Sequence, residues 1–270
     1  MRINTNVSAI VSNNALQKAQ DALSSSIQRL SSGYKINRAA DDAAGLSISE
    51  KMRSQIRGLN KASDNAQDGI SLIQVAEGAL NETHSILQRM NELATQAAND
   101  TNTSVDRQSI KDEIEQLNAE LDRISTKTQF NKQDLLTGKF SGKLQVGALE
   151  GQTMDLKIST AVSSTGLKVK DIKVSTNENA GKAMKSIQDA IESVSKQRSK
   201  LGAIQNRLEH TINNLDTNAE NTQAAESRIR DTDMADEMVQ YSKNNILSQA
   251  GQSMLAQANQ QTQGVLSLLG

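Results

Sequence analysis

No proline occurs anywhere in the 270 residues of this chain. Proline breaks the interior of a helix because it lacks the N–H donor and clashes with the preceding turn, so its absence favours long uninterrupted helices. Aromatic residues make up only 1% of the chain, whereas large aromatic side chains supply much of the buried area of compact cores. We therefore predict a mainly α fold, an elongated antiparallel helical bundle or coiled coil, with one small β-hairpin region.

The charge pattern excludes several classes of partner. The formal net charge is −1 and both signs are mixed along the chain, so we expect neither nucleic acid nor an anionic membrane as a partner. No apolar run approaches the roughly 20 residues that span a bilayer, which argues against membrane insertion. Residues 1–10 lack a basic segment followed by an apolar run, so no cleaved secretory signal is expected. Cysteine is absent, which excludes disulfides and thiolate chemistry.

The stretch Met234–Gly270 carries an apolar stripe that it cannot bury alone. Met238, Ile246 and Met254 recur at helical spacing, and the other positions are mostly Gln, Asn and Ser. A single amphipathic helix of this kind needs a partner. We predict that the partner is a helix over Asn4–Leu30, whose leucines stand seven residues apart as in a coiled coil.

Three further helices are predicted between these ends. The apolar pattern indicates helices from Leu46 to about Asn99, from Thr103 or Ser104 to about Lys127, and from Asn179 to Asp231. Asp41 or Asp42 can cap the first of them. The glycines inside that long helix are expected to permit close approach of another helix; they are Gly58, Gly69 and Gly78.

The period changes from helical to alternating after Phe130. Leu144 alternates with Val146, and Met154 with Leu156 and Ile158, on either side of the turn-rich Gly147–Gly151. This arrangement predicts a β-hairpin. The following residues up to Val174 are interpreted as extended or irregular chain, so the β region covers about 140–175.

No residue cluster points to catalysis, a cofactor or a metal. The chain has two histidines, His84 and His210, and no HExxH motif, so we expect no metal site. The adjacent Asp41 and Asp42 resemble a pair of carboxylates for acid–base work, but capping a helix start is the more common role of such residues. An enzyme is therefore not expected.

Three segments of the chain closely resemble bacterial flagellins. The first is MRINTNVSAI followed by ALSSSIQRLSSGYKINRAADDAAGLSISEKM at Ala22–Met52. The second is LGAIQNRLEHTINNL at Leu201–Leu215 followed by ESRIRDTDMADEM at Glu226–Met238, and the third is ILSQAGQSMLAQANQQTQGVLSLLG at Ile246–Gly270. The resemblance covers almost the whole chain and is poor only in the hairpin region. It implies a structural subunit that polymerises into the flagellar filament for motility.

The resemblance also implies a domain organisation. A terminal coiled-coil domain (D0-like) would combine 1–33 with 234–270, a connector would occupy 34–45, and a helical rod domain (D1-like) would occupy 46–233. The variable outer domains of many flagellins would be missing. Residues expected to pack in the filament core are Leu16, Leu23, Ile27, Leu30, Met238, Ile246, Met254, Leu255, Val265, Leu266, Leu268 and Leu269, and Arg207 is expected to pack in the rod.

Partners and location follow from the same resemblance. The implied partners are further copies of this chain, an export chaperone and a filament cap, and the implied location is the extracellular bacterial flagellum, reached through type III export. The stretch LQRMNELATQAAND at Leu87–Asp100 resembles the flagellin segment that vertebrate Toll-like receptor 5 recognises. Arg89, Leu93 and Glu113 match the family's recognition positions, as a donor fork, an apolar contact and a carboxylate.

Two alternatives to a filament subunit stay open at this point. A hook–filament junction protein would share the pattern of the two ends of the chain. A cytoplasmic signalling coiled coil would share the helical hairpin, although it would have a hairpin-tip motif in the middle rather than strands. The LGAIQNR and VLSLL motifs favour the filament subunit.

Overall fold

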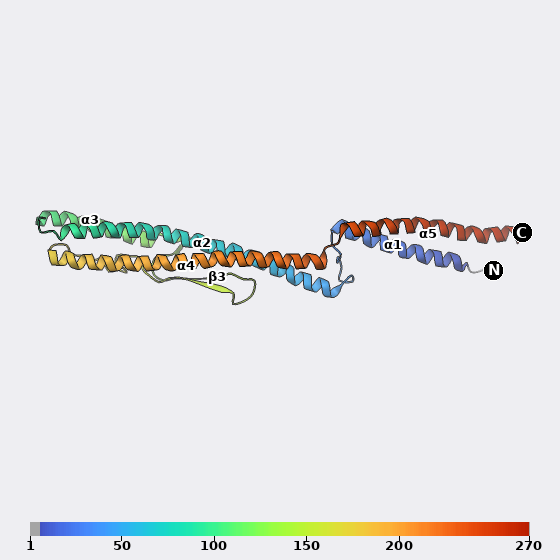
Figure 1. Ribbon diagram of the computed structural model, residues 1–270, viewed down its shortest axis with the longest axis horizontal. Coiled ribbons are helices and arrows are strands. Elements are labelled where there is room, and N and C mark those ends of the chain that lie inside the picture. The colour runs from blue at the N-terminus through green and yellow to red at the C-terminus, as the bar shows by residue number, and fades with distance from the viewer. Residues whose placement is uncertain (1–5, 270) are drawn as a thin grey trace. The chain divides into compact units, whose positions relative to one another are not determined.

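A computed structural model describes the backbone of residues 6–269 and the side chains of residues 6–261. Five α-helices dominate the described chain (Figure 1), which confirms the predicted mainly α class. The chain forms two compact units. Unit 1 comprises Met1–Ser54 with Asn221–Gly270, and unit 2 comprises Gln55–Glu220. The elements, in chain order, are α1 (Val7–Ser32), α2 (Ala43–Ala97), α3 (Ser104–Lys127), β1 (Gln129–Phe130), β2 (Gln133–Asp134), β3 (Phe140–Gln145), β4 (Thr153–Ile158), α4 (Asn177–Arg230) and α5 (Met234–Leu269).

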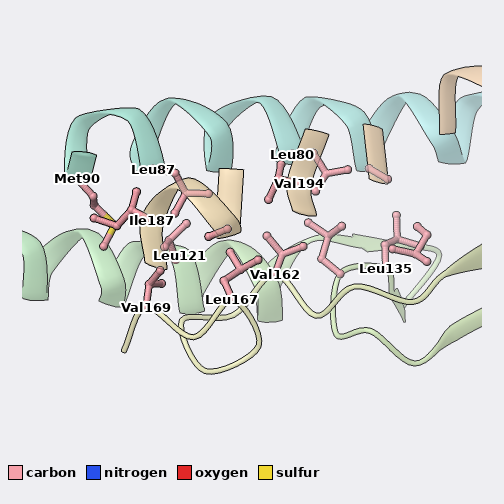
Figure 2. Packing of buried hydrophobic residues seen from close by; sticks show 14 of the residues in the cluster. Leu80, Leu87, Met90, Leu121, Leu135, Val162, Leu167, Val169, Ile187 and Val194 are labelled. Carbon is pink, nitrogen blue, oxygen red and sulfur yellow. The ribbon is translucent and has the colours of Figure 1, made fainter. Parts of the chain in front are cut away.

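Unit 2 closes a continuous apolar core between three helices. Within this unit α3 and α4 run antiparallel to α2 (Figure 1). Both helices begin near the carboxy-terminal end of α2 and run back along it. Figure 2 shows the side chains that meet between the helices, and each labelled residue is at most 5% exposed. From the helices these are Leu80, Leu87, Met90, Leu121, Ile187 and Val194.

Polar caps set where the helices begin. Asn6 accepts a hydrogen bond from the Ala9 N–H at the start of α1, and Thr103 and Asp106 form a capping box at the start of α3. Asp42 accepts from the Gly45 N–H at 2.9 Å, which confirms the expected cap of α2. Asp41 instead closes the preceding turn, accepting from the backbone N–H groups of Asn37 and Arg38. These two hydrogen bonds, the one from Arg38 first, hold the pKa of Asp41 below its ordinary value.

The predicted hairpin is present. β3 and β4 pair antiparallel, with Leu144 opposite Met154, and the buried residues of β4 alternate with exposed ones. The pair β1–β2 was not predicted, because two-residue strands leave no period in the sequence. After β4 the chain is irregular but well anchored. Val162, Leu167 and Val169 point from it into the helical core (Figure 2) and are at most 5% exposed.

The three glycines of α2 differ in what packs against them, and the expected approach of another helix is found only at Gly69. A Cβ at Gly58 would lie 2.7 Å from the Ala148 Cβ, and one at Gly69 would lie 2.5 Å from a methyl of Leu144. The β3–β4 hairpin therefore makes the closest approach at both positions, and at Gly69 a methyl of Leu208 on α4 also lies at 3.4 Å. At Gly78 nothing lies within 4 Å of an added Cβ, so this glycine has no packing role in the described chain.

We predict opposite effects of alanine at two of these glycines. Gly78→Ala should stabilise the protein by about 0.5–1 kcal/mol, because alanine loses less backbone entropy in a helix. Gly58→Ala should lower stability, because its Cβ would collide with the Ala148 Cβ and with the backbone there. Urea unfolding followed by circular dichroism at 222 nm measures both. Equal gains at both positions would show that the hairpin does not pack where the structure places it.

Candidate assembly and recognition surfaces

Helices α1 and α5 pack along each other (Figure 1), and the side chains that are buried on them are mostly small or polar. Leu16 is buried on α1, and its side chain lies 3.4 Å from where a Cβ of Gly251 would be. Up to residue 261, the buried residues of α5 are Glu237, Ser248 and Ala258. The Asn6 side-chain amide donates to the Ala258 carbonyl at 2.9 Å, and Arg29 lies 3.6 Å from Glu237. Polar contacts at both ends of the seam therefore fix its register.

The predicted apolar stripe of α5 faces α1 only in part: Ala258 and Leu255 lie at the seam, whereas its large residues Met238, Ile246 and Met254 do not. Met238, Ile246 and Met254 are 50%, 66% and 62% exposed. The reason is geometric. At about 100° per residue, residues four apart drift by about 40° per step, so Met238 and Met254 lie about 160° apart around the helix. A single partner helix cannot cover both.

The predicted filament-core residues thus divide into three groups. Leu16 is buried in the α1–α5 seam, and Leu23, Leu30 and Leu255 are half-buried beside it. The exposed group is Ile27, Met238, Ile246 and Met254. The side chains of Val265, Leu266, Leu268 and Leu269 lie outside the described residues. Altogether, ten large apolar side chains on the described parts of α1 and α5 are 48% to 66% exposed: Val7, Ile10, Val11, Ile27, Met234, Met238, Val239, Ile246, Leu247 and Met254.

The two linkers of unit 1 are joined around Arg230, a residue that the sequence interpretation missed. Its guanidinium contacts Glu50 on α2 at 2.7 Å and stacks 4.8 Å from the centre of the Tyr34 ring. Its backbone carbonyl accepts from the Lys35 N–H at 2.7 Å, and the Thr232 N–H donates to the Gly33 carbonyl at 3.0 Å. The segments after α1 and before α5 are thereby held side by side.

Arg89 and Glu113 meet on the surface of unit 2. The Arg89 guanidinium donates from Nε to the Glu113 carboxylate at 3.0 Å, linking α2 to α3, and also to Glu92 at 3.2 Å. The hydrogen bond with Glu113, followed by the one with Glu92, raises the pKa of Arg89. Arg89 and Glu113 are 52% and 45% exposed in their side chains. Glu92 was not among the predicted residues, although its spacing of three from Arg89 is typical of a helical ion pair.

The predicted role of Leu93 as an exposed apolar contact does not fit its position. Leu93 is 2% exposed and belongs to the core of unit 2. It therefore supports the surface from below and offers almost no area to another molecule.

The remaining predicted residues form no cluster. Arg207 is exposed on α4 and makes no ion pair within the described chain, so packing of its guanidinium inside the subunit is not observed. The His84 ring contacts Gln88 at 3.0 Å. Among residues 6–261, no three His, Cys, Asp or Glu side chains are grouped as a metal site would require. None of the described helices combines the length and the apolar character that crossing a membrane requires.

Comparison with known proteins gives consistent matches along the chain. A family model described as the bacterial flagellin N-terminal helical region matches residues 3–141, and one described as the bacterial flagellin C-terminal helical region matches 184–269. A flagellin of Halalkalibacterium halodurans is 57% identical over 247 residues, covering 90% of each chain. A flagellin of Bacillus subtilis is 50% identical over 304 residues, covering 100% of each chain. The crystal structure of Bacillus cereus flagellin, 33% identical, covers 60% of this chain and 94% of its own with a TM-score of 0.51.

The Arg230 cluster predicts how stability depends on pH. The hydrogen bond from Arg230 is the largest cause of a lowered pKa at Glu50, whose ordinary value is 4.5. The carboxylate therefore stabilises the fold above pH 4.5, and this contribution is lost as the pH falls through the lowered value. Glu50→Gln removes the charge, so this variant should lose less stability than the unaltered chain between pH 7 and pH 3.

The measurement is urea unfolding at both pH values, and Glu150→Gln is the matched control. Glu150 is an exposed residue in the hairpin turn with no ion pair among the described residues. The Glu150→Gln variant should lose as much stability between pH 7 and pH 3 as the unaltered chain. If Glu50→Gln also loses as much stability as the unaltered chain, the ion pair with Arg230 does not contribute to stability in solution.

Proposed function

The chain belongs to the bacterial flagellin family, and on that premise we propose that the uncovered apolar faces of α1 and α5 drive its polymerisation into the flagellar filament. The protein is a structural subunit of that filament. The observation that carries the proposal is the contrast between the two units. Unit 2 buries most of its large apolar side chains and leaves three exposed, Val75, Val105 and Leu149, whereas the described parts of α1 and α5 leave ten 48% to 66% exposed.

Magnitudes indicate that each subunit needs several neighbours. Covering one half-exposed aliphatic side chain contributes roughly 1 kcal/mol at ~25 cal/mol per Å². Ten of them contribute on the order of 10 kcal/mol, which is comparable to the 4–15 kcal/mol that association costs in lost freedom of motion. One contact between two chains would use only part of this area. Because the exposed residues lie on several faces of α5, copies on different sides are needed, as in a tube.

The domain boundaries remain a proposal. We place a terminal domain over 1–33 with 234–270, since α1 ends at Ser32 and α5 begins at Met234. The linkers joined by Arg230 would then connect this domain to a rod domain over 46–233. In support, Gly33 adopts a left-handed conformation with φ of 75° that stops α1 at this point.

The finer partners and the location rest on family membership. We propose export through the flagellar type III apparatus to the cell exterior, with a chaperone and a filament cap as partners. We also propose that Toll-like receptor 5 binds at Arg89 and Glu113, which are exposed and held by their mutual ion pair. With Leu93 buried, apolar contact would have to come from other residues.

One observation bears on the junction-protein alternative. A structure of a putative flagellar hook-associated protein from Vibrio parahaemolyticus has a TM-score of 0.60 and 12% identity, covering 71% of this chain and 100% of its own. At that identity the likeness concerns the fold alone. The relatives that are 57% and 50% identical are named flagellins, which favours the filament subunit and a structural rather than a catalytic role.

Removal of Met254–Gly270 should abolish filament formation, because part of the uncovered face of α5 is lost with it. Negative-stain electron microscopy after salt-induced assembly checks this. The point variant Ile246→Gln separates assembly from folding, because Ile246 is 66% exposed in the single chain. It should leave monomer stability within about 0.5 kcal/mol and raise the critical concentration about fivefold to tenfold.

Val105→Gln is the matched control, since Val105 is 72% exposed on α3 and lies outside α1 and α5. Its critical concentration should be unchanged. Normal tubes from the shortened chain, or equal effects at Ile246 and Val105, would refute the assigned role of α5.

Arg89→Ala should weaken both receptor binding and filament formation, because the same exposed helix face would serve both. The control is Arg123→Ala, which removes an exposed arginine that is paired with Glu120 on α3. Binding to immobilised receptor ectodomain and sedimentation of filaments are the two measurements. Normal filaments with unchanged receptor affinity in Arg89→Ala would remove the proposal of a shared surface.

A further inference from the structure

A hollow of about 410 Å³ in unit 2 is lined by four lysines. Lys168, Lys170 and Lys173 come from the irregular segment before α4, and Lys182 comes from the second turn of α4. Asp171 is the only acidic residue in the lining. In a chain whose net charge is −1, this is a marked local excess of positive charge.

Three of these lysines lack a carboxylate partner. Lys182 lies 2.6 Å from Glu178, but within the described chain no ion pair involves Lys168, Lys170 or Lys173. Three ammonium groups around one hollow repel one another, and an anion in the hollow would relieve this repulsion.

The segment that carries the lysines is fixed from below. Leu167, Val169 and Val174 are at most 5% exposed and alternate with the lysines. Buried Asn118 donates to the Val169 carbonyl at 3.1 Å. Asp122 accepts from both the backbone N–H and the hydroxyl of Ser164, at 2.8 and 2.9 Å. The lysine backbones are therefore held in place before any ligand arrives, which lowers the entropic cost of binding.

Lys168 itself adopts a left-handed conformation with φ of 59°. This region is uncommon for a residue with a side chain, and surrounding contacts must maintain it. The Lys168 N–H donates to the Thr165 carbonyl at 3.2 Å, which closes the turn. Along this segment, buried residues point into the core, and the exposed lysines between them all line the same hollow.

A second hollow of about 400 Å³ shares Lys173 with the first and adds Arg107 and Lys111. These two cations are already paired, with Asp100 and Glu115, each at 3.2 Å. The unpaired charge is therefore concentrated in the first hollow, and the second continues the basic surface.

We infer that the first hollow, named here the lysine hollow, binds a sulfate or phosphate group. Such a group carries up to two negative charges and several acceptor oxygens, which match ammonium donors arriving from different directions. The group could arrive as the free ion or as a substituent of an acidic polysaccharide, whose neighbouring groups would reach the second hollow. The inference does not depend on filament assembly.

The test uses the full chain as a monomer and measures the acylation rate of each lysine by mass spectrometry. The probes are inorganic sulfate, inorganic phosphate and heparin, at constant ionic strength. Lys168, Lys170 and Lys173 should be protected, while Lys139, Lys143 and Lys200 should not, since these are exposed and unpaired within the described chain. Protection by the inorganic ions supports a site for the free ion. Protection by heparin alone supports a group carried on a polymer.

A charge-matched pair of variants provides the second measurement. Lys168→Gln/Lys170→Gln/Lys173→Gln should weaken binding of the protecting probe about tenfold or more, the combined effect expected from three lost exposed ion pairs. Lys139→Gln/Lys143→Gln/Lys200→Gln makes the same change in net charge and should leave the affinity unaltered. Circular dichroism verifies that both fold. Absence of selective protection by every probe, or equal weakening in both variants, would overturn the inference.

Discussion

The seam between α1 and α5 is the interaction on which the role of this subunit depends. It includes Leu16, Ser248, Gly251 and Ala258, so it brings the two helices close while most of the large apolar side chains of the described part of α5 stay exposed. Burial of small residues contributes little hydrophobic free energy, since that free energy scales with the apolar area removed from water. The seam orders the pair, and most of the apolar area stays available to other chains.

Unit 2 behaves in the opposite way. Its three helices and the irregular segment after β4 enclose a core in which Leu80, Leu121 and Ile187 are fully buried. Such a core stabilises a single chain without neighbours. The core that stabilises the single chain and the exposed apolar side chains that we propose drive association therefore lie in different parts of the sequence. A subunit that must stay folded before assembly requires a stable core of its own, and a polymer requires apolar surface that neighbouring subunits can cover.

The sequence predicted helix boundaries well because caps and periods are local signals. Thr103 begins α3 as expected, and the turn at Gly147–Gly151 separates two paired strands. It failed where the answer depended on three-dimensional packing. A four-residue recurrence on α5 looked like one stripe, although it spirals around the helix. Leu93 matched a recognition motif by sequence, but its neighbours in the core decide that it is buried. The contact between Arg230 and Glu50 joins residues 180 apart in the sequence, so no local sequence pattern predicts it.

The Arg230 cluster explains how a weak seam can still be held in one register. The seam depends on helices from the two ends of the sequence, so bringing them together costs loop-closure entropy. Arg230 contacts Glu50 and Tyr34, and the backbone of its segment pairs with Lys35. The chain segments that follow α1 and precede α5 are therefore held adjacent by contacts that lie outside the seam. Only the rotation and axial position of the two helices remain to be set, and the contacts Asn6–Ala258 and Arg29–Glu237 are enough to set them.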